Sequence, residues 1–218
     1  MHRLVLALAL ACSTLSVPAV ADACGNSVLA GLYRRIQRAE AALDAGKYQQ
    51  AARLARAELA KQEDARAGDQ QLEHRARRVL ALAVVRGRGP IRVHEGIGDV
   101  HQDQQTAAIS WAITALRQVR AFAVSQHVDC ALDPALCSDD LVPRANAELA
   151  EAYARSPDLR GEALAILTRI AEADLMPGPD AWAALARLRG EQGDAAGRAL
   201  AVQRCRQMAA QVARCGEL

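Results

Sequence analysis

Aromatic side chains are scarce in this chain, which holds one phenylalanine, two tryptophans and three tyrosines. β-sheets are rich in aromatic and β-branched residues, so this shortage argues against a sheet. A charge excess is also lacking, because basic and acidic residues leave a net charge of only +2 at pH 7. Proteins that bind nucleic acid usually carry a larger basic excess, so we expect no nucleic-acid partner.

Long apolar runs are absent as well. The run Leu4 to Ala11 is far shorter than the roughly 20 residues that cross a hydrocarbon core, and no later stretch is longer and equally apolar, so we expect no transmembrane span. This run instead follows His2 and Arg3 and precedes small residues, which is the order of a secretory signal peptide. Residues 1–23 are therefore predicted to be a leader, cleaved after Ala21 or Ala23.

The remaining residues, 24–218, are predicted to form a single domain that is exported to the periplasm or secreted. Six cysteines are present, and Cys12 leaves with the leader, so an odd number enters an oxidising compartment. Cys130 and Cys137 flank a turn-forming Asp-Pro pair, and we predict a disulfide between them.

Cys205 and Cys215 would lie about 15 Å apart along one straight helix, so they can pair only if the helix ends between them. Otherwise Cys24 must reach one of them, which would bring the two ends of the chain together. Cys24 has another possible fate, as the lipidated first residue of an outer-membrane lipoprotein. The protein would then be a structural or assembly module that is anchored to the outer membrane by lipid at Cys24. The preceding Ala21-Asp22-Ala23 departs from the usual lipobox, which has an aliphatic residue three positions before the cysteine.

Helical periodicity dominates the rest of the chain. Eight helices are predicted, over Asn26–Asp44, Lys47–Asp64, Asp69–Val85 with Asp69 as N-cap, Thr106–Gln126, Asp140–Arg155, Leu159–Asp174, Asp180–Gln192 and Asp194–Arg214. Ala45-Gly46 and the segment Met176 to Pro179 separate neighbouring helices. Residues Arg86 to Gln105 contain four glycines and a proline, and they predict a loop far longer than the usual helix connection.

An internal repeat gives the clearest architectural signal. Residues 145–175 resemble residues 181–211 with an offset of 36, although roughly a fifth of the chain is alanine and some matches arise by chance. The matching pairs are Ala145/Ala181, Ala147/Ala183, Leu149/Leu185, Ala150/Ala186, Asp158/Asp194, Gly161/Gly197, Ala163/Ala199, Leu164/Leu200, Ala165/Ala201 and Ala173/Ala209. A period of this length is typical of one helical hairpin, which cannot bury its apolar face alone and so stacks on copies of itself.

The residues of these hairpins resemble the tetratricopeptide repeat family. That family places large, small, aromatic and turn-glycine residues at fixed offsets. In this chain the matching residues are Trp182, Leu185, Ala186 and Gly193 in the last copy, Leu149, Ala150 and Tyr153 in the copy before it, and Ala39, Gly46, Tyr48 and Ala51 in the first hairpin. Ala163 and Ala199 depart from the family by one position, Arg189 replaces an aromatic, and Pro157 replaces a turn glycine.

The resemblance implies an all-α fold, a right-handed stack of about four antiparallel helical hairpins. Its copies would span about 29–63, 145–179 and 181–215, with residues 86–105 as an inserted loop. For function it implies a scaffold without catalytic activity or cofactor that binds a protein or peptide in the cell envelope. Recognition would use the inner surface of the stack, with the inserted loop shaping one side.

The inserted loop carries a second hypothesis, a metal-dependent envelope enzyme. His94, Glu95, Asp99, His101 and Asp103 are imidazole and carboxylate groups that suit zinc. A solvated polar loop explains the same residues, since their spacing matches no helical ligand pair. No nucleophile motif of the Gly-x-Ser-x-Gly type is present, and no paired carboxylates stand out.

Two further groups of residues have alternative interpretations. The densest basic run comprises Arg75, Arg77, Arg78, Arg86, Arg88 and Arg92. We interpret it as a solvated helix face or as a surface for an anionic partner such as lipid headgroups. Trp111 and Trp182 could line a groove, but apolar residues at helical spacing are more often core, and core is expected for both.

Overall fold

In a computed structural model, the structure describes residues 23–64, 69–87, 89, 91, 101–126, 142–209 and 215. Within these residues all regular structure is helical, which confirms the all-α class. The elements are α1 (Ala23–Asp44), α2 (Tyr48–Asp64), α3 (Gln70–Arg86), α4 (His101–Ser125), α6 (Pro143–Tyr153), the 3-10 turn η3 (Pro157–Leu159), α7 (Arg160–Glu172), α8 (Pro179–Glu191) and α9 (Ala195–Met208). None of these helices is both long and apolar enough to cross a membrane.

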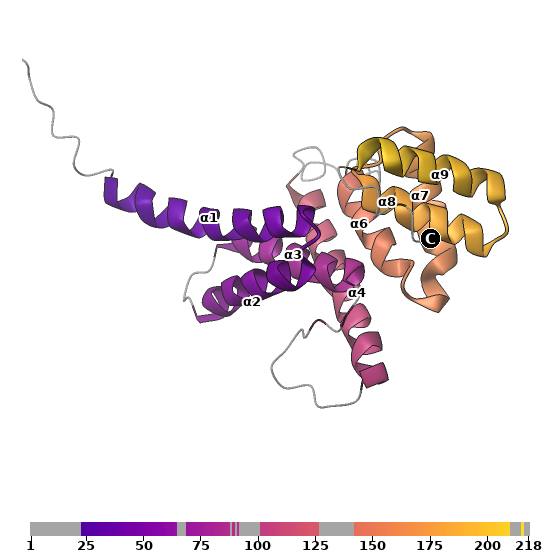
Figure 1. The fold of residues 1–218 in the computed structure, drawn as a ribbon. Helices are drawn as coiled ribbons and strands as arrows, with labels where there is room; N and C mark the ends of the chain where they lie inside the picture. The colour runs from indigo at the N-terminus through magenta and orange to yellow at the C-terminus, as the bar shows by residue number, and fades with distance from the viewer. Residues whose placement is uncertain are drawn as a thin grey trace, which may run out of the picture.

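The helices follow one another across the molecule, from α1 to α4 on one side and from α6 to α9 on the other (Figure 1). Each helix packs against the next one along the chain. In addition α1 packs on α3, α3 on α6, and α6 on α8, so alternate helices also touch. The core is continuous through both halves and is built from alanine, leucine, isoleucine and valine, with Trp182 and Tyr153 as its large aromatic members.

Turn residues set the helix ends where the sequence predicts them. Gly46 has a φ of 71°, and its N–H and that of Lys47 donate to the carbonyls of Leu43 and Ala42, which closes the end of α1 in the manner of a Schellman motif. Asp69 caps α3, because its carboxylate accepts hydrogen bonds from the backbone N–H groups of residues 71 and 72 at 2.9 and 3.2 Å.

Four predicted boundaries are wrong by three residues or more. α1 begins at Ala23 rather than Asn26. α4 begins at His101, so the helix takes up the last part of the expected 86–105 loop. α6 begins at Pro143 rather than Asp140, because proline suits the first helical position, where no N–H is needed. α9 ends at Met208 rather than Arg214, since Ala209 is extended, with φ −83° and ψ 124°.

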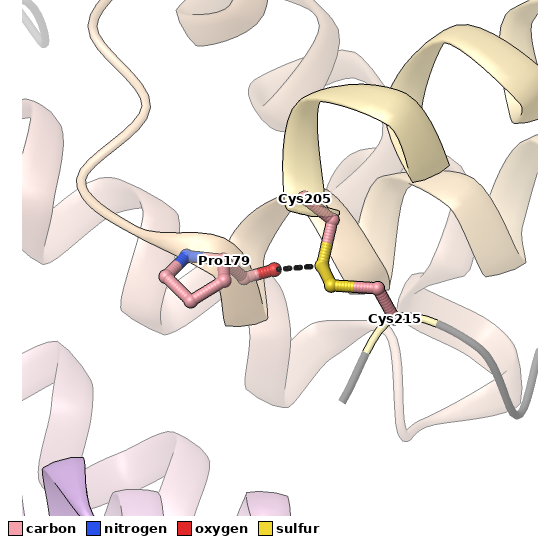
Figure 2. Close-up of a disulfide and its surroundings, with 3 residues drawn as sticks. All are labelled: Pro179, Cys205 and Cys215. Carbon is pink, nitrogen blue, oxygen red and sulfur yellow. Dashed lines mark hydrogen bonds between the residues drawn. A yellow bond between two sulfur atoms is a disulfide. The ribbon is translucent and has the colours of Figure 1, made fainter. Parts of the chain in front are cut away.

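The early end of α9 allows a disulfide between Cys205 and Cys215, whose Cα atoms lie 5.8 Å apart (Figure 2). Both cysteines are buried, and the Sγ atom of Cys205 lies 3.2 Å from the carbonyl oxygen of Pro179, at the start of α8. The alternative in which Cys24 pairs with one of these two cysteines is therefore wrong. The predicted Cys130–Cys137 bridge and residues 1–22 of the predicted leader lie outside the described residues, whereas Ala23, the last residue of the predicted leader, begins α1.

The two copies of the internal repeat differ in burial. Their first helices, α6 and α8, bury the matching Leu149 and Leu185. In their second helices the matches diverge, because Ala163 of α7 is fully buried whereas Ala199 of α9 is exposed. α7 packs against α8, but no described helix follows α9, so the corresponding face of α9 stays in solvent. Leu200 is consequently 51% exposed.

The matched glycines of the repeat give a first prediction. A Cβ at Gly161 would meet nothing within 4 Å, whereas one at Gly197 would overlap the carboxylate of Asp194, which caps α9. We expect G161A to raise the free energy of unfolding by about 0.5–1 kcal/mol, because alanine favours the helix. We expect G197A to lower it by about 1 kcal/mol, because the cap is lost. Urea unfolding of both variants checks this, and equal effects at the two sites would contradict it.

Candidate functional site

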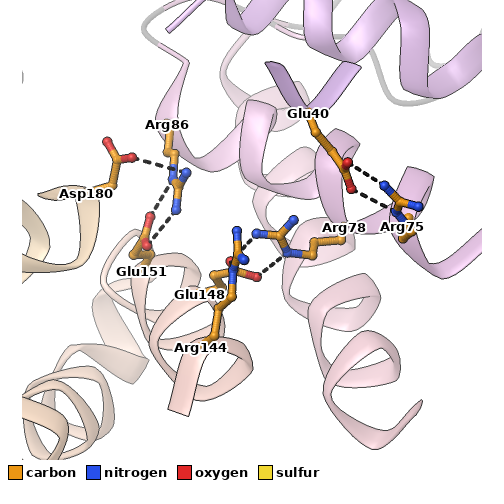
Figure 3. A network of polar contacts seen from close by, with 8 residues as sticks. All are labelled: Glu40, Arg75, Arg78, Arg86, Arg144, Glu148, Glu151 and Asp180. Carbon is orange, nitrogen blue, oxygen red and sulfur yellow. Dashed lines mark hydrogen bonds and ion pairs between the residues drawn. The ribbon is translucent and has the colours of Figure 1, made fainter. Parts of the chain in front are cut away.

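A ladder of arginine–carboxylate pairs crosses the interior of the molecule (Figure 3). We use the name arginine ladder for Arg75, Arg78 and Arg86 of α3 together with their acceptors Glu40 of α1, Glu148 and Glu151 of α6, and Asp180 of α8. It joins four helices that alternate along the chain, and so it connects the N-terminal helices to the C-terminal ones.

The pairs of the ladder are forked, two-bond contacts. Arg75 donates to Glu40 at 3.0 and 2.6 Å, and Arg86 donates to Glu151 at 2.7 and 2.8 Å. Arg78 makes the same kind of contact with Glu148, with the Nε bond at 2.6 Å. The side chains of Arg78 and Arg86 are only 16% and 14% exposed, so most of the ladder is shielded from water and salt.

The two glutamates of α6 respond differently to this burial. Burial alone would raise the pKa of Glu148, but the hydrogen bonds and charge of Arg78, with the charges of Arg86 and Arg144, outweigh it and hold that pKa below its ordinary value. Burial raises the pKa of Glu151, and the charge and hydrogen bonds of Arg86 only partly offset this, since the neighbouring charges of Asp180 and Glu148 raise it further. The carboxylates are thus held by fixed partners, which is the pattern of a structural network rather than of an acid and base awaiting a substrate.

The ladder corrects the interpretation of the basic run as a solvated or partner-facing surface. Arg75, Arg78 and Arg86 point into the protein and are paired there. Arg77 pairs with Glu73 on the same helix. Arg88 and Arg92 lie outside the described residues. Among the described members of the run, none is left to form an anionic partner site.

A different surface is hollowed and basic. A groove of about 720 Å³ lies between the first half of α4, the turn that joins α6 to α7, and the end of α8. We call it the arginine groove. It is lined by Gln105, Thr106, Ile109, Ser110, Ile113, Thr114, Arg117, Ala154, Arg155, Ser156, Pro157, Leu159, Arg160, Arg187 and Glu191.

Four arginines and one carboxylate line this groove. Glu191 lies 3.6 Å from Arg160 and 4.0 Å from Arg187, with side chains that are 31–48% exposed. Arg117 is placed by Tyr153, to whose hydroxyl its Nε donates at 2.9 Å and over whose ring its guanidinium lies at 5.3 Å. Burial lowers the pKa of Arg187, and the neighbouring charge of Arg155 lowers it further. Positive charge therefore exceeds negative charge on the groove wall.

The groove's wall also contains apolar surface. Ile109 and Ile113 are 7% exposed and lie one helical turn apart on α4. Leu159 of η3 lies across from them and packs against the core. Basic groups beside an apolar wall can hold a ligand that has both a negative group and an apolar one.

The predicted site residues of the inserted loop are not brought into this groove. His94, Glu95 and Asp99 lie outside the described residues, and only the backbone of His101 and Asp103 is described, within α4. Within the described part of the chain no group of three or more metal-ligating side chains comes together. The metal hypothesis therefore stays a prediction.

A second surface hollow lies along α9 alone, over Arg198, Val202 and Arg206.

The tryptophans divide. Trp182 is 6% exposed and confirms the core prediction, whereas Trp111 is only partly buried against the core.

Sequence reasoning missed both the ladder and the groove. Glu148 and Glu151 are spaced three apart on one helix face, which is a detectable signal, but their partners are 65 and 70 residues away. No local pattern links residues so far apart.

His74 of α3 gives a prediction on pH dependence. Its ring stacks on Phe122 with centroids 4.0 Å apart, and its Nδ1 atom is buried without a hydrogen-bond partner among the described residues. Burial lowers the pKa of His74, as does the charge of Arg77, while Glu73 opposes them. The folded protein thus disfavours the charged ring.

The lowered pKa of His74 sets the direction in which the stability of the fold changes with pH. The neutral form contributes stability above the unfolded pKa of about 6.5, and this stability is lost as the pH falls towards the folded pKa. H74F keeps the stacked ring and removes the titration, so unfolding free energies measured between about pH 7.5 and 5.5 should fall less in H74F than in the native chain. Identical slopes would show that His74 is not protonated unfavourably in the fold.

Comparison of the chain with protein-family models, curated proteins and solved structures finds no match.

Proposed function

We propose that this protein is an exported helical-repeat scaffold of the tetratricopeptide-like type, and that it binds a protein or peptide partner in the cell envelope. The pattern of helix contacts supports the stack. In a stack of hairpins the first helix of each hairpin touches both its own second helix and the first helix of the next hairpin. The contacts of α1 with α3, α3 with α6, and α6 with α8 follow this rule.

The observation that carries the binding role is the arginine groove. A groove lined by four arginines and one carboxylate, beside an apolar wall, has unused binding capacity. The groove lies next to the start of α4, directly after the segment that the sequence singles out as an insertion. Peptide segments suit such a surface, because they present charged and apolar side chains together.

Site-specific photo-crosslinking tests the binding role. A photoreactive amino acid at Ser110, an exposed groove residue on α4, should give a discrete adduct when the tagged protein is expressed in a cell with an intact envelope. The same residue at Ala57, which is exposed on α2 away from the groove, is the matched control. Adducts at Ser110 alone support the proposal. No adduct, or the same adducts at both positions, would contradict it.

Export is tested by the mass of the mature chain. A protein recovered from the periplasm with an unmodified N-terminus at Asp22 or Cys24 fits the proposal. A diacylated Cys24 would instead make the protein a lipoprotein, and a full-length chain retained in the cytoplasm would contradict export.

A further inference from the structure

Two sets of arginines in this protein are used in opposite ways. Those of the arginine ladder are each matched by carboxylates in forked contacts. In the arginine groove Arg160 and Arg187 share Glu191 at 3.6 and 4.0 Å, and for Arg155 the described residues provide no carboxylate within ion-pair distance. Every arginine of the ladder thus has a carboxylate partner of its own, whereas the arginines of the groove do not.

The groove's charges repel one another across a partly dry surface. Burial lowers the pKa of Arg187, the charges of Arg155 and Arg160 lower it further, and the charges of Glu191 and Glu151 only partly offset them. A ligand carboxylate placed among these three guanidiniums would relieve the repulsion and accept charge-assisted hydrogen bonds. Guanidinium groups suit this task because their planar fork matches a carboxylate.

The apolar wall narrows the class of anion. Ile109 and Ile113 offer a surface on which an aliphatic side chain can pack, beside the basic turn. A peptide carries aliphatic and carboxylate side chains on neighbouring residues, whereas a nucleic-acid backbone or a lipid headgroup surface offers phosphates alone. The net charge of the whole chain is only +2, whereas proteins that bind a polyanion usually carry a large basic excess.

We infer that the arginine groove binds an acidic segment of the partner, with its carboxylates among Arg155, Arg160 and Arg187 and an adjacent aliphatic side chain on Ile109 and Ile113. This inference rests on the proposed function and specifies the chemistry of the partner. Because the attraction is electrostatic at a half-exposed site, binding weakens as the salt concentration rises.

The test is selection of short random peptides on the full chain by messenger-RNA display, followed by fluorescence anisotropy with the labelled winners. We expect winners to be enriched in Asp or Glu next to Leu, Ile or Val. R155E/R160E should weaken their binding by at least about tenfold. R155Q/R160Q removes the charges without adding repulsion and keeps the test valid if the first variant unfolds. R53E, which reverses one charge at an exposed site on α2, should alter affinity less than about twofold.

Each outcome separates the inference from the function it rests on. Winners that are neutral or basic but still depend on groove residues would overturn the acidic-segment inference and leave the peptide-binding function standing. No winners, together with no crosslink from Ser110, would overturn both. Binding to phosphatidylglycerol vesicles that is lost in R155Q/R160Q, without any acidic peptide winner, would assign the groove to anionic headgroups and overturn the inference.

Discussion

R86A is expected to lower the free energy of unfolding by about 3–5 kcal/mol, because it leaves the buried carboxylate of Glu151 without its cation. Glu151 is 4% exposed and receives both of its hydrogen bonds of 2.7 and 2.8 Å from Arg86. Asp180, from another helix, loses its 3.1 Å partner in the same variant. Equilibrium unfolding in urea, followed by far-ultraviolet circular dichroism, measures the loss.

The pH dependence of this variant identifies the cause. Burial already raises the pKa of Glu151, and removal of Arg86 takes away the charge that opposes this rise. A carboxyl whose folded pKa is raised stabilises the fold at low pH and loses that stability as the pH rises through the folded pKa. The penalty of R86A relative to the native chain should therefore be smaller near about pH 5 than near about pH 8.

R77A is the matched control. Arg77 is an arginine of the same helix, but its pair with Glu73 is more exposed, at 27% and 36%, and lies within one helix. Exposed pairs of this kind contribute about 0.5 kcal/mol or less. If R86A and R77A lower the free energy of unfolding equally, the buried pairs of the ladder do not stabilise the fold more than an exposed pair does.

C215S is expected to lower the free energy of unfolding by about 2–3 kcal/mol, because it opens the short loop closed by the Cys205–Cys215 disulfide. The loop spans ten residues and ties the chain beyond α9 to the buried side of that helix, next to Pro179 (Figure 2). Thermal or urea unfolding under non-reducing conditions measures the effect. Mass spectrometry of unreduced tryptic fragments should show the crosslinked pair in the native protein.

The double variant C205A/C215S separates the bond from the packing of Cys205. If the disulfide is the stabilising element, the second substitution adds only the small cost of truncating a buried sulfur group, and the two losses are far from additive. Additive losses, or a native chain in which Cys205 is found paired with another cysteine, would contradict the assigned bridge.

Local signals explain why the sequence predicts most helices correctly. Gly46 and Asp69 act through their own backbone conformation or a neighbouring N–H, so their effects are visible in a few residues of sequence. Gly193 with a φ of 79°, followed by the cap Asp194, belongs to the same group. Such residues fix where helices start and stop without reference to the rest of the fold.

Local sequence signals do not predict helix boundaries that depend on distant contacts. Residues 209–214 contain no glycine or proline that would end a helix, so the helical periodicity predicts that the helix continues to Arg214. The structure ends it earlier, and Cys215 returns to α9. A disulfide depends on three-dimensional proximity, which periodicity does not contain.

The arginine ladder and the arginine groove were not predicted, for the same reason. The arginines of α3 look like a solvated face in sequence, since nothing near them announces that Glu148 and Glu151 lie opposite. The groove combines α4 with residues of the α6–α7 turn and α8, which approach one another only in the fold. The internal repeat predicts equivalent helices, but it does not predict that Leu200 is exposed at the open side of α9.

The most direct test of the proposed binding surface is methyl nuclear magnetic resonance of the full chain titrated with a selected acidic peptide. Binding in the arginine groove predicts that the δ1-methyl signals of Ile109 and Ile113 shift, together with those of Leu159, while Leu200 and Val202 on α9 stay unchanged. Shifts confined to Leu200 and Val202, with the Ile109 and Ile113 signals unmoved, would place the peptide on the α9 surface and contradict the assignment of the groove.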